Sequence, residues 1–399
     1  MNLPLEGIKV LDFTQFQQGP YATLLLADMG AEVWKVEKPG SGDLGRGIGS
    51  TNAPPEIYAN YFFTFNRNKK SVVVDIKKPL GKEVVYRLAE KADVCVNNFR
   101  PGVMESLGFS YEDLARRNSR LIYAAASGFG PKGPKRARPV TDLAAQAMGG
   151  LMSITGEVEG YPLSVGSCIA DQMGATSLAW GIVTALFVRE RTGIGQQVEG
   201  SLLGSQIVLQ AWEFNQYLRT RELKTKAGRH HPLIPGIYGS FKAKDRYFVI
   251  AGVKEEHWQD FCRLLDIPHL VEDPRFDSAE KRRQNQEELI DILDPIFATK
   301  EIKEWLEILE SLEIICAPVN TYKEVAEEPQ VLENEYICNI PHPELGEVQV
   351  IGLPIKFSKT PGQVQGLAPA LGQHTREVLL QAGYGEEEIT ELRRQKVIP

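Results

Sequence analysis

The chain has 399 residues, of which 43% are apolar and 24% are charged, and its formal net charge is −7. This length exceeds the roughly 50–250 residues of a typical domain, so we expect two domains in an ordinary soluble globular protein. Basic and acidic residues are interspersed, which argues against a nucleic-acid partner but still allows a local basic pocket for a polyanionic ligand.

The N-terminal segment lacks a basic region followed by an apolar run, and no uncharged apolar stretch of about 18 residues occurs. We therefore expect no signal peptide, no membrane span and no membrane partner. The five cysteines are far apart and odd in number, and the six histidines show no ligand spacing. This pattern predicts neither disulfides nor a metal site, as is typical of a cytoplasmic protein.

Short β-branched runs alternate with helical patterns over the first 200 residues. The predicted strands are Ile8–Phe13, Glu32–Glu37, Ser71–Asp75, Val94–Phe99 and Leu121–Ser127. Helices are predicted at Tyr21–Met29 and from Pro79 onward. This alternation predicts an α/β fold with a parallel sheet covered on both faces. Ligands bind such sheets at the carboxyl ends of the strands, which lead here into loops Thr14–Pro20, Lys38–Asp43, Asn97–Gly102 and Gly128–Arg138.

A long helix is predicted from Asp171 to about Arg191, then a strand at Gln196–Leu202 and a helix to about Leu223. Turn residues near Gly228 mark a crossing into a second domain. The elements expected there are the hairpin Tyr238–Ala243 and Tyr247–Ala251, helices Glu255–Leu265, Ala279–Phe297 and Glu301–Leu312, and the strand Ile314–Val319. A last helical segment is expected at Thr375–Arg393. We thus expect a large domain formed by residues 1–225 and 331–399, and a smaller inserted α/β domain at 226–330.

The opening strand, turn and helix resemble a dinucleotide site, and Glu37 lies where a ribose-binding acid belongs. The turn Gln15–Pro20, however, has one glycine where three are needed for close approach to a pyrophosphate. A nicotinamide oxidoreductase is therefore an unfavoured alternative. No GxSxG motif supports a hydrolase triad, and a structural role is favoured for His230 and His231.

Asp171 lies at the predicted start of the long helix. The local pattern alone favours an N-cap, because Asp commonly accepts hydrogen bonds from the free amides there. The alternative is a nucleophile, held ionised by the helix end and flanked by free amides that could stabilise an oxyanion.

Basic residues gather at the predicted carboxyl ends of the strands. They are Lys38, Arg46, Arg67, Lys69, Lys77, Arg100, Lys132, Lys135, Arg136 and Arg138. Each alone fits a solvated surface, but together they would suit the 3′-phosphate and pyrophosphate of coenzyme A.

Several stretches, in order along nearly the whole chain, carry a family resemblance. They are Gly7–Asp12, Gly19-Pro20, Gly30–Val33, Lys35–Glu37, Asn66–Ser71, Asn98–Gly102, Ser127–Gly130, Ala170-Asp171, Arg189–Gln196 and Leu371–Thr375. The chain resembles the class III CoA-transferases, which include formyl-CoA transferase and carnitine CoA-transferase, with α-methylacyl-CoA racemase as a relative.

The resemblance implies a Rossmann-like large domain built from both chain ends, a smaller middle domain, and a dimer of interlocked rings. It implies that Asp171 attacks an acyl-CoA to give an aspartyl anhydride and then an aspartyl-CoA thioester, with Gln17 as a second catalytic residue. The positions implied for binding coenzyme A are Gln17, Lys38, Val74, Lys77, Asn98, Phe99 and Arg100. Arg138 of the basic group is added to them as a further candidate.

Departures from the family pattern narrow the expected activity. Thr141 stands where the racemases carry an acid–base histidine, so racemisation is a lesser alternative. The region Ala251–His257 lacks the glycine run of formyl-CoA transferases, which argues against a formate–oxalate pair. Arg46, Arg67 and Arg138 suggest a dicarboxylic donor such as succinyl-CoA. Two assemblies fit the sequence, a homodimer and a CoA-binding subunit that depends on a paralogous chain.

Overall fold

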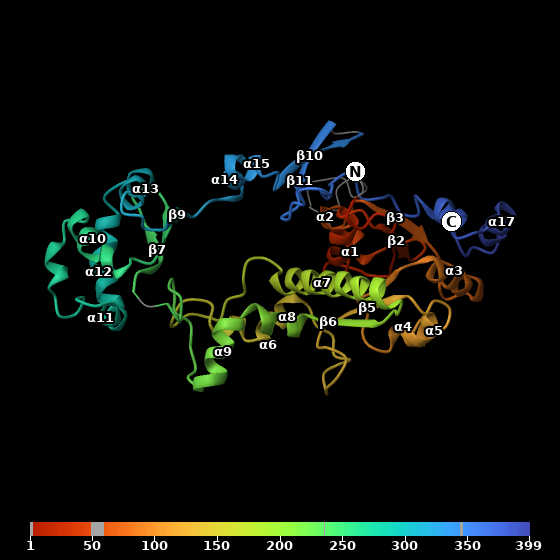
Figure 1. Ribbon diagram of the computed structural model, residues 1–399, viewed down its shortest axis with the longest axis horizontal. Helices are drawn as coiled ribbons and strands as arrows, with labels where there is room; N and C mark the ends of the chain where they lie inside the picture. The colour runs from red at the N-terminus through yellow and green to blue at the C-terminus, as the bar shows by residue number, and fades with distance from the viewer. Residues whose placement is uncertain (1–2, 49–59, 235, 344–345) are drawn as a thin grey trace. The chain divides into compact units, whose positions relative to one another are not determined.

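The computed structural model describes residues 3–48, 60–234, 236–343 and 346–399 (Figure 1). The chain divides into two compact units. The first comprises Met1–Gly149, Gly166–Gln210 and Pro329–Pro399, and the second comprises Gly150–Val165 and Ala211–Glu328. Both chain ends therefore contribute to the first unit. The domain limits 1–225, 226–330 and 331–399 stay a prediction.

A six-stranded parallel sheet is the centre of the first unit, with strand order β3-β2-β1-β4-β5-β6. The strands are β1 (Lys9–Asp12), β2 (Glu32–Glu37), β3 (Lys69–Val73), β4 (Val94–Asn97), β5 (Ile122–Ser127) and β6 (Gln197–Ser201). This is the strand order of doubly wound sheets. The direction in which strands are added reverses between β1 and β4, and this leaves a crevice at the carboxyl ends of the strands. The predicted α/β fold with a parallel sheet is confirmed.

Helices cover both faces of this sheet (Figure 1). Those of the first unit are α1 (Gln18–Asp28), α2 (Asn60–Asn66), α3 (Pro79–Lys91), α4 (Val103–Leu107), α5 (Tyr111–Ala115), α6 (Asp142–Met148), α7 (Ile169–Thr192), α8 (Leu202–Leu209), α15 (Pro329–Glu333), α16 (Thr375–Gln381) and α17 (Glu386–Arg394). A short helix at Leu44–Gly47 and the hairpin β10 (Ile337–His342) and β11 (Gly346–Ile351) complete it.

Alternation along the strands produces two separate apolar layers, because successive side chains point to opposite faces. Val10 and Val33 pack with residues of α1 and α7 on one face. Leu11 and Trp34, their neighbours in sequence, pack with residues of α3, α16 and α17 on the other. The C-terminal helices are therefore part of the core of the first unit.

The second unit has a separate core around a three-stranded antiparallel sheet. Its elements are α9 (Ala211–Thr220), β7 (Tyr238–Lys242), β8 (Tyr247–Ala251), α10 (Trp258–Leu264), α11 (Ala279–Gln284), α12 (Gln286–Phe297), α13 (Ile302–Glu310), β9 (Cys316–Pro318) and α14 (Tyr322–Glu327). Single-turn helices lie at Leu151–Ser153, Glu255–His257 and Pro268–Val271.

Several predicted boundaries were wrong. The helix expected at Ala279–Phe297 is two helices that meet at Asn285, and the helix expected after β6 is interrupted at Gln210. The third strand begins at Lys69 rather than Ser71, because Lys69 and Lys70 already pair with residues of β2. In the described part of the chain, no helix has the length and apolar character that crossing a bilayer requires.

Candidate active site

Asp171 is the third residue of α7, a helix of 24 residues. It lines a cavity of about 610 Å³ together with residues that follow β1, β4 and β5. These strand ends share one edge of the parallel sheet, so the cavity lies in the crevice where this fold binds ligands. The first turn of α7 therefore presents the carboxyl group to a site that three loops enclose.

Asp142 caps this helix, and the expectation that Asp171 is the N-cap was wrong. The Cys168 residue occupies the N-cap position without a side-chain hydrogen bond. The Asp142 Oδ1 atom accepts from the backbone amides of Ala170 at 2.7 Å and Asp171 at 3.2 Å. The Gln146 side chain donates to Asp142 Oδ2 at 2.6 Å. The expectation of free amides is thus wrong for these two, which are already bound to a carboxylate.

Burial, and next the charge of Asp142, raise the pKa of Asp171 to about 7. The helix end therefore does not hold this carboxyl group firmly ionised, contrary to expectation. Burial disfavours the carboxylate, and the neighbouring anion disfavours it further. Burial raises the pKa of the Cys168 thiol as well, with Asp142 and Asp171 adding to the shift. A carboxyl group with a pKa near neutrality is typical of a functional site.

Gln17 lies in the same cavity and is held by Tyr61, a residue of α2. The Tyr61 hydroxyl lies 3.3 Å from Gln17 Oε1 and donates to it. Burial, and then the charge of Asp171, raise the pKa of Tyr61, so this hydroxyl is a proton donor at neutral pH. Since the amide oxygen is engaged, the Gln17 Nε2 group is the one left to donate.

Two loops of the cavity are joined through Asn98. Its Oδ1 accepts from the Gln15 amide at 2.8 Å, and its Nδ2 donates to the Gln15 carbonyl at 2.7 Å. The same loops contribute Gln17, Phe99 and Arg100 to the cavity wall. Asn98 therefore fixes the loop after β1 against the loop after β4.

The structure brings five of the eight predicted coenzyme A positions into the wall of this cavity. They are Gln17, Asn98, Phe99, Arg100 and Arg138. The other three positions do not line the cavity. Lys38 directly follows β2 and is exposed, Lys77 is exposed in the turn after β3, and Val74 is buried at the end of β3.

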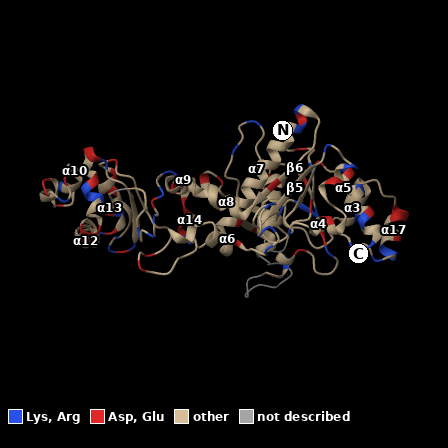
Figure 2. Cartoon of the chain, turned by 90° about the horizontal axis from the view of Figure 1, so that it is seen from below, with Lys and Arg blue, Asp and Glu red and all other residues tan. Residues whose placement is uncertain are grey.

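Three residues of the predicted basic rim have other partners. Lys69 is buried beside Asp12 and donates to the carbonyl of Pro20, and burial lowers its pKa to about 8. Arg46 and Arg67 form ion pairs with Glu37 and Asp28. The expectation that these two arginines are spare groups for a dicarboxylate was wrong, whereas Arg138 is exposed at the cavity. Elsewhere basic and acidic residues intermix along the chain (Figure 2).

A buried ion pair shapes the loop that carries Gln17. The Lys35 ammonium lies 2.8 Å from Asp43 Oδ2 and donates to the Thr14 carbonyl at 2.7 Å. The Asp43 Oδ1 atom accepts from the backbone amide of Phe16 at 3.1 Å. Phe16 has φ 64, a left-handed conformation that non-glycine residues seldom adopt. The ion pair therefore helps to hold a strained residue next to Gln17.

The residues Asp142, Cys168 and Asp171 bring potential metal-ligand atoms within 4.8 Å of one another. Both oxygens of Asp142, however, already accept hydrogen bonds from the first turn of α7 and from Gln146. This arrangement is explained by helix capping. The metal-free site stays a prediction.

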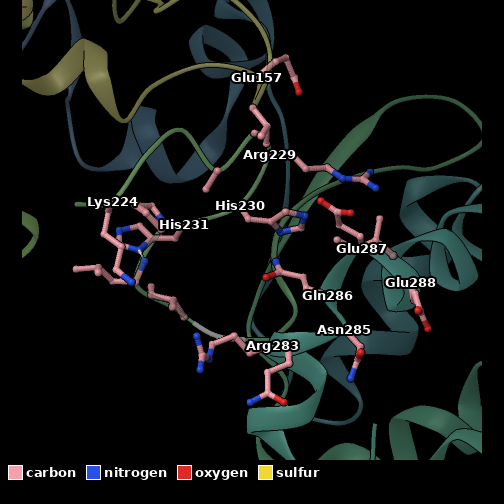
Figure 3. A pocket seen from close by; sticks show the side chains of 18 of the residues that line it. Glu157, Lys224, Arg229, His230, His231, Arg283, Asn285, Gln286, Glu287 and Glu288 are labelled. Atoms are coloured by element: carbon pink, nitrogen blue, oxygen red, sulfur yellow. Dashed lines mark hydrogen bonds between the residues drawn. The ribbon is translucent and has the colours of Figure 1, made fainter. Parts of the chain in front are cut away.

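His230 and His231 line a different cavity, of about 1110 Å³, within the second unit (Figure 3). His231 Nε2 lies 3.2 Å from Glu213 Oε1, and its ring stacks on Trp212. His230 Nδ1 lies 3.3 Å from the Tyr238 carbonyl. These contacts fit the structural role expected for both histidines.

Sequence reasoning named none of Tyr61, Cys168, Gln18 and Asp142 as a residue of the site, and all four line the cavity. Tyr61 belongs to α2, a helix that was not predicted. Gln18 was placed in the loop Thr14–Pro20 at the expected ligand-binding edge, but α1 already begins at this residue. Asp142 lies 28 residues before Ala170, whose amide it binds, so no local pattern connects the two. The adjacency of Cys168 to Asp171 was a usable signal, because helix starts place such neighbours close together.

A doubly wound sheet with a half-buried carboxyl group of near-neutral pKa in its crevice defines an α/β enzyme site that can support acid–base or nucleophilic chemistry. The model of one family, described as CoA-transferase family III, matches residues 5–375. The chain belongs to CoA-transferase family III and is a transferase, so the resemblance read from the sequence is confirmed. Enzymes of this family use CoA thioesters as substrates.

Similar proteins are known from several organisms. The chain is 38% identical to the succinyl-CoA:glutarate CoA-transferase of Mus musculus, over 94% of this chain and 86% of the relative. It is 37% identical to the succinyl-CoA:mesaconate CoA-transferase of Haloarcula hispanica, over 96% and 97%. A crystal structure of a CaiB/BaiF family protein from Brucella suis is 31% identical, with a TM-score of 0.85 over 96% of this chain and all of that one.

Proposed function

We propose that this enzyme transfers coenzyme A from succinyl-CoA to a short dicarboxylic acid, with Asp171 as the nucleophile. The observation that carries the proposal is the position of Asp171 in the first turn of α7, where burial and Asp142 raise its pKa to about 7. Two relatives, a succinyl-CoA:glutarate and a succinyl-CoA:mesaconate CoA-transferase, support the choice of substrates.

The chemistry proceeds by four substitutions at carbonyl carbon. A carboxylate oxygen of Asp171 attacks the thioester, and the CoA thiolate leaves to give a mixed anhydride. The thiolate then attacks the aspartyl carbonyl, which releases succinate and forms an aspartyl-CoA thioester. The acceptor carboxylate attacks this thioester to form a second anhydride and release the thiolate. Attack of the thiolate on the acyl carbonyl gives the new acyl-CoA and restores Asp171.

Gln17 supports the tetrahedral states of these steps in this proposal. Its Oε1 is engaged by Tyr61, so the Nε2 group can donate to an oxygen that becomes negative. Coenzyme A would lie along the carboxyl edge of the sheet. We assign its phosphates to Lys38, Lys77, Arg100 and Arg138, all of which are exposed, and its less polar parts to Asn98, Phe99 and Val74.

The lesser alternatives have weaker support. Thr141 lines the cavity, and its hydroxyl cannot replace the acid–base histidine of a racemase. A non-catalytic subunit would not need a carboxyl group poised near neutrality. We also propose an interlocked dimer, preferably of identical chains, in the cytoplasm, where the five free cysteines would stay reduced.

The first prediction tests the nucleophile. Asp171→Asn and Asp171→Ala should each lower kcat for transfer from succinyl-CoA to glutarate by at least about 10³-fold, because neither side chain can form the anhydride. Calorimetry should show CoA affinity within about threefold of the parent, since the phosphate contacts are made elsewhere. Near-normal turnover by either protein, once deamidation has been excluded, would refute the role. Transfer by the chain expressed alone excludes dependence on a paralogue.

A further inference from the structure

An unpartnered side-chain amide lies in the wall of the Asp171 cavity. Gln18, the first residue of α1, is 5% exposed and lines the cavity. Its Nε2 atom is buried without any hydrogen-bond partner among the described residues. Buried polar groups are nearly always paired, so an exception requires an explanation. Because this atom has almost no exposed surface, the Gln18 side chain must rotate toward the cavity that it lines, where a ligand oxygen would provide the missing acceptor.

Gly174 of α7 has no side chain and so leaves room for this amide. A Cβ atom added to Gly174 would lie 2.6 Å from Gln18 Nε2 and 3.2 Å from Gln18 Cγ. Any larger residue at Gly174 would therefore displace the amide. The glycine in the interior of α7 weakens the helix relative to alanine, so its presence fits a need for close approach.

The position of Gly174 relative to Asp171 indicates which part of a substrate the amide can reach. The two residues are three apart in α7 and so lie on one face, with a rise of about 4.5 Å between them. This rise is less than one helical turn, so a short dicarboxylic acid is of a size to extend from one residue to the other. A substrate carboxyl group at Asp171 would place its second carboxylate near the Gln18 amide.

We infer that Gln18 determines acyl specificity by donating a hydrogen bond to the second carboxylate of a short dicarboxylic acyl group. The inference rests on the proposed transfer of coenzyme A, and it adds the group that selects the acid. A neutral amide suits this task because it can bind the anion without placing a positive charge that would pair with the nearby Asp171. The Gln18–Gly174 pair is thus one specificity element shared by α1 and α7.

The test compares glutarate with pentanoate, the monocarboxylic acid of equal chain length, as acceptors with one donor, succinyl-CoA. The quantity measured is the ratio of kcat/KM for glutarate to that for pentanoate. A hydrogen bond to a charged group predicts that Gln18→Leu lowers this ratio about ten- to a hundredfold. Gly174→Ala should lower it in the same direction while raising the intrinsic helix propensity of α7.

Gln206→Leu is the matched control. Gln206 is also buried, and its side-chain amide has no partner among the described residues, but it does not line the cavity. Its substitution should leave the ratio at the parent value. An unchanged ratio in Gln18→Leu, a parent-like ratio in Gly174→Ala, or an equal fall in Gln206→Leu would overturn the inference.

A binding measurement separates this inference from the proposed function. Calorimetry of glutarate with the CoA-saturated protein should show weaker binding to Gln18→Leu than to the parent, whether or not transfer occurs. Gln18-dependent glutarate binding without any transfer would reject the proposed function and support the specificity site. Transfer activity together with equal glutarate affinity in both proteins would support the proposed function and reject the specificity site.

Discussion

The carboxyl group of Asp171 is subject to two effects that both raise its pKa. It is withdrawn from water, which makes a carboxylate more reactive, and it stands beside Asp142, which opposes its ionisation. Asp142 also holds the helix start through the amides of Ala170 and Asp171. Asp142 therefore positions the proposed nucleophile and, after burial, contributes to its raised pKa.

The second prediction concerns pH. Only the carboxylate form of Asp171 can attack, so kcat/KM should rise about tenfold per pH unit below a midpoint near pH 7 and level off above it. Asp142→Asn keeps an acceptor for the two amides but removes the neighbouring charge, so the midpoint should move to lower pH. Stopped-flow rates between pH 5 and pH 9 measure both proteins. The same midpoint in both would contradict this role of Asp142.

Among the elements, the loop between β1 and α1 carries Gln17 and depends on a buried ion pair. Asp43 bonds the amide of the strained Phe16 and pairs with Lys35. Removing one member of a buried pair leaves the other charge uncompensated. The shape of the site thus depends on charges that lie behind the cavity wall.

The third prediction compares two substitutions of Asp43. Asp43→Ala should lower the free energy of unfolding by about 3–5 kcal/mol, because Lys35 loses a partner. Asp43→Asn should also destabilise, but it keeps an acceptor for Phe16 and should therefore retain a higher kcat. Denaturant unfolding and steady-state kinetics measure the two effects.

Asp28→Ala is the control for this comparison, since it breaks a buried pair with Arg67 away from the loop. It should destabilise the protein while leaving kcat of the folded enzyme near the parent value. Equal kcat losses in Asp43→Ala and Asp43→Asn would show that the contact with Phe16 does not position the loop.

Elements were predictable from sequence where the signal is local. A short β-branched run predicted β2 without error, and Pro79 marked the start of α3. The partners of Asp171 were not predictable in this way. Asp142 caps α7 from a separate helix, and the Gln18 side chain packs in the space that Gly174 leaves free. Such pairings depend on packing between elements distant in sequence, which neither propensity nor periodicity describes.

Buried cations were a second source of error. Lys69 and Arg67 stand among basic residues at strand ends, a pattern that favours a solvated rim. Their acidic partners, Asp12 and Asp28, lie about 40–60 residues earlier in the chain. Charge counting cannot tell a ligand-binding cation from one that is neutralised in the core, because both have the same local sequence.

At the scale of the whole molecule, one exposed face of α7 carries a row of apolar side chains. Trp180, Val183 and Phe187 lie at helical spacing and are 75%, 43% and 60% exposed. Contiguous exposed apolar residues of this kind mark interaction surfaces. They support the proposed dimer, and the passage of the chain out of the first unit and back offers a route for the interlocking.

The fourth prediction follows from interlocking. Tagged and untagged dimers mixed under native conditions should stay separate for days, because dissociation would require unfolding, and they should mix after denaturation and refolding. Affinity capture followed by mass analysis measures the exchange. Substituting Asp for Phe187 should impair assembly, whereas Asp at the exposed Glu190 should not. Exchange within minutes would rule the arrangement out.

The proposed mechanism depends most on a covalent bond to Asp171, and trapping this bond is the most direct test. The protein would be incubated with succinyl-CoA, treated with borohydride, digested and analysed by mass spectrometry. Borohydride reduces an acyl anhydride or thioester to the alcohol, so Asp171 should become a hydroxyl-bearing residue in the parent and remain unmodified when CoA replaces succinyl-CoA. Transfer activity with an unmodified Asp171, or reduction at a different carboxyl group, would contradict the account.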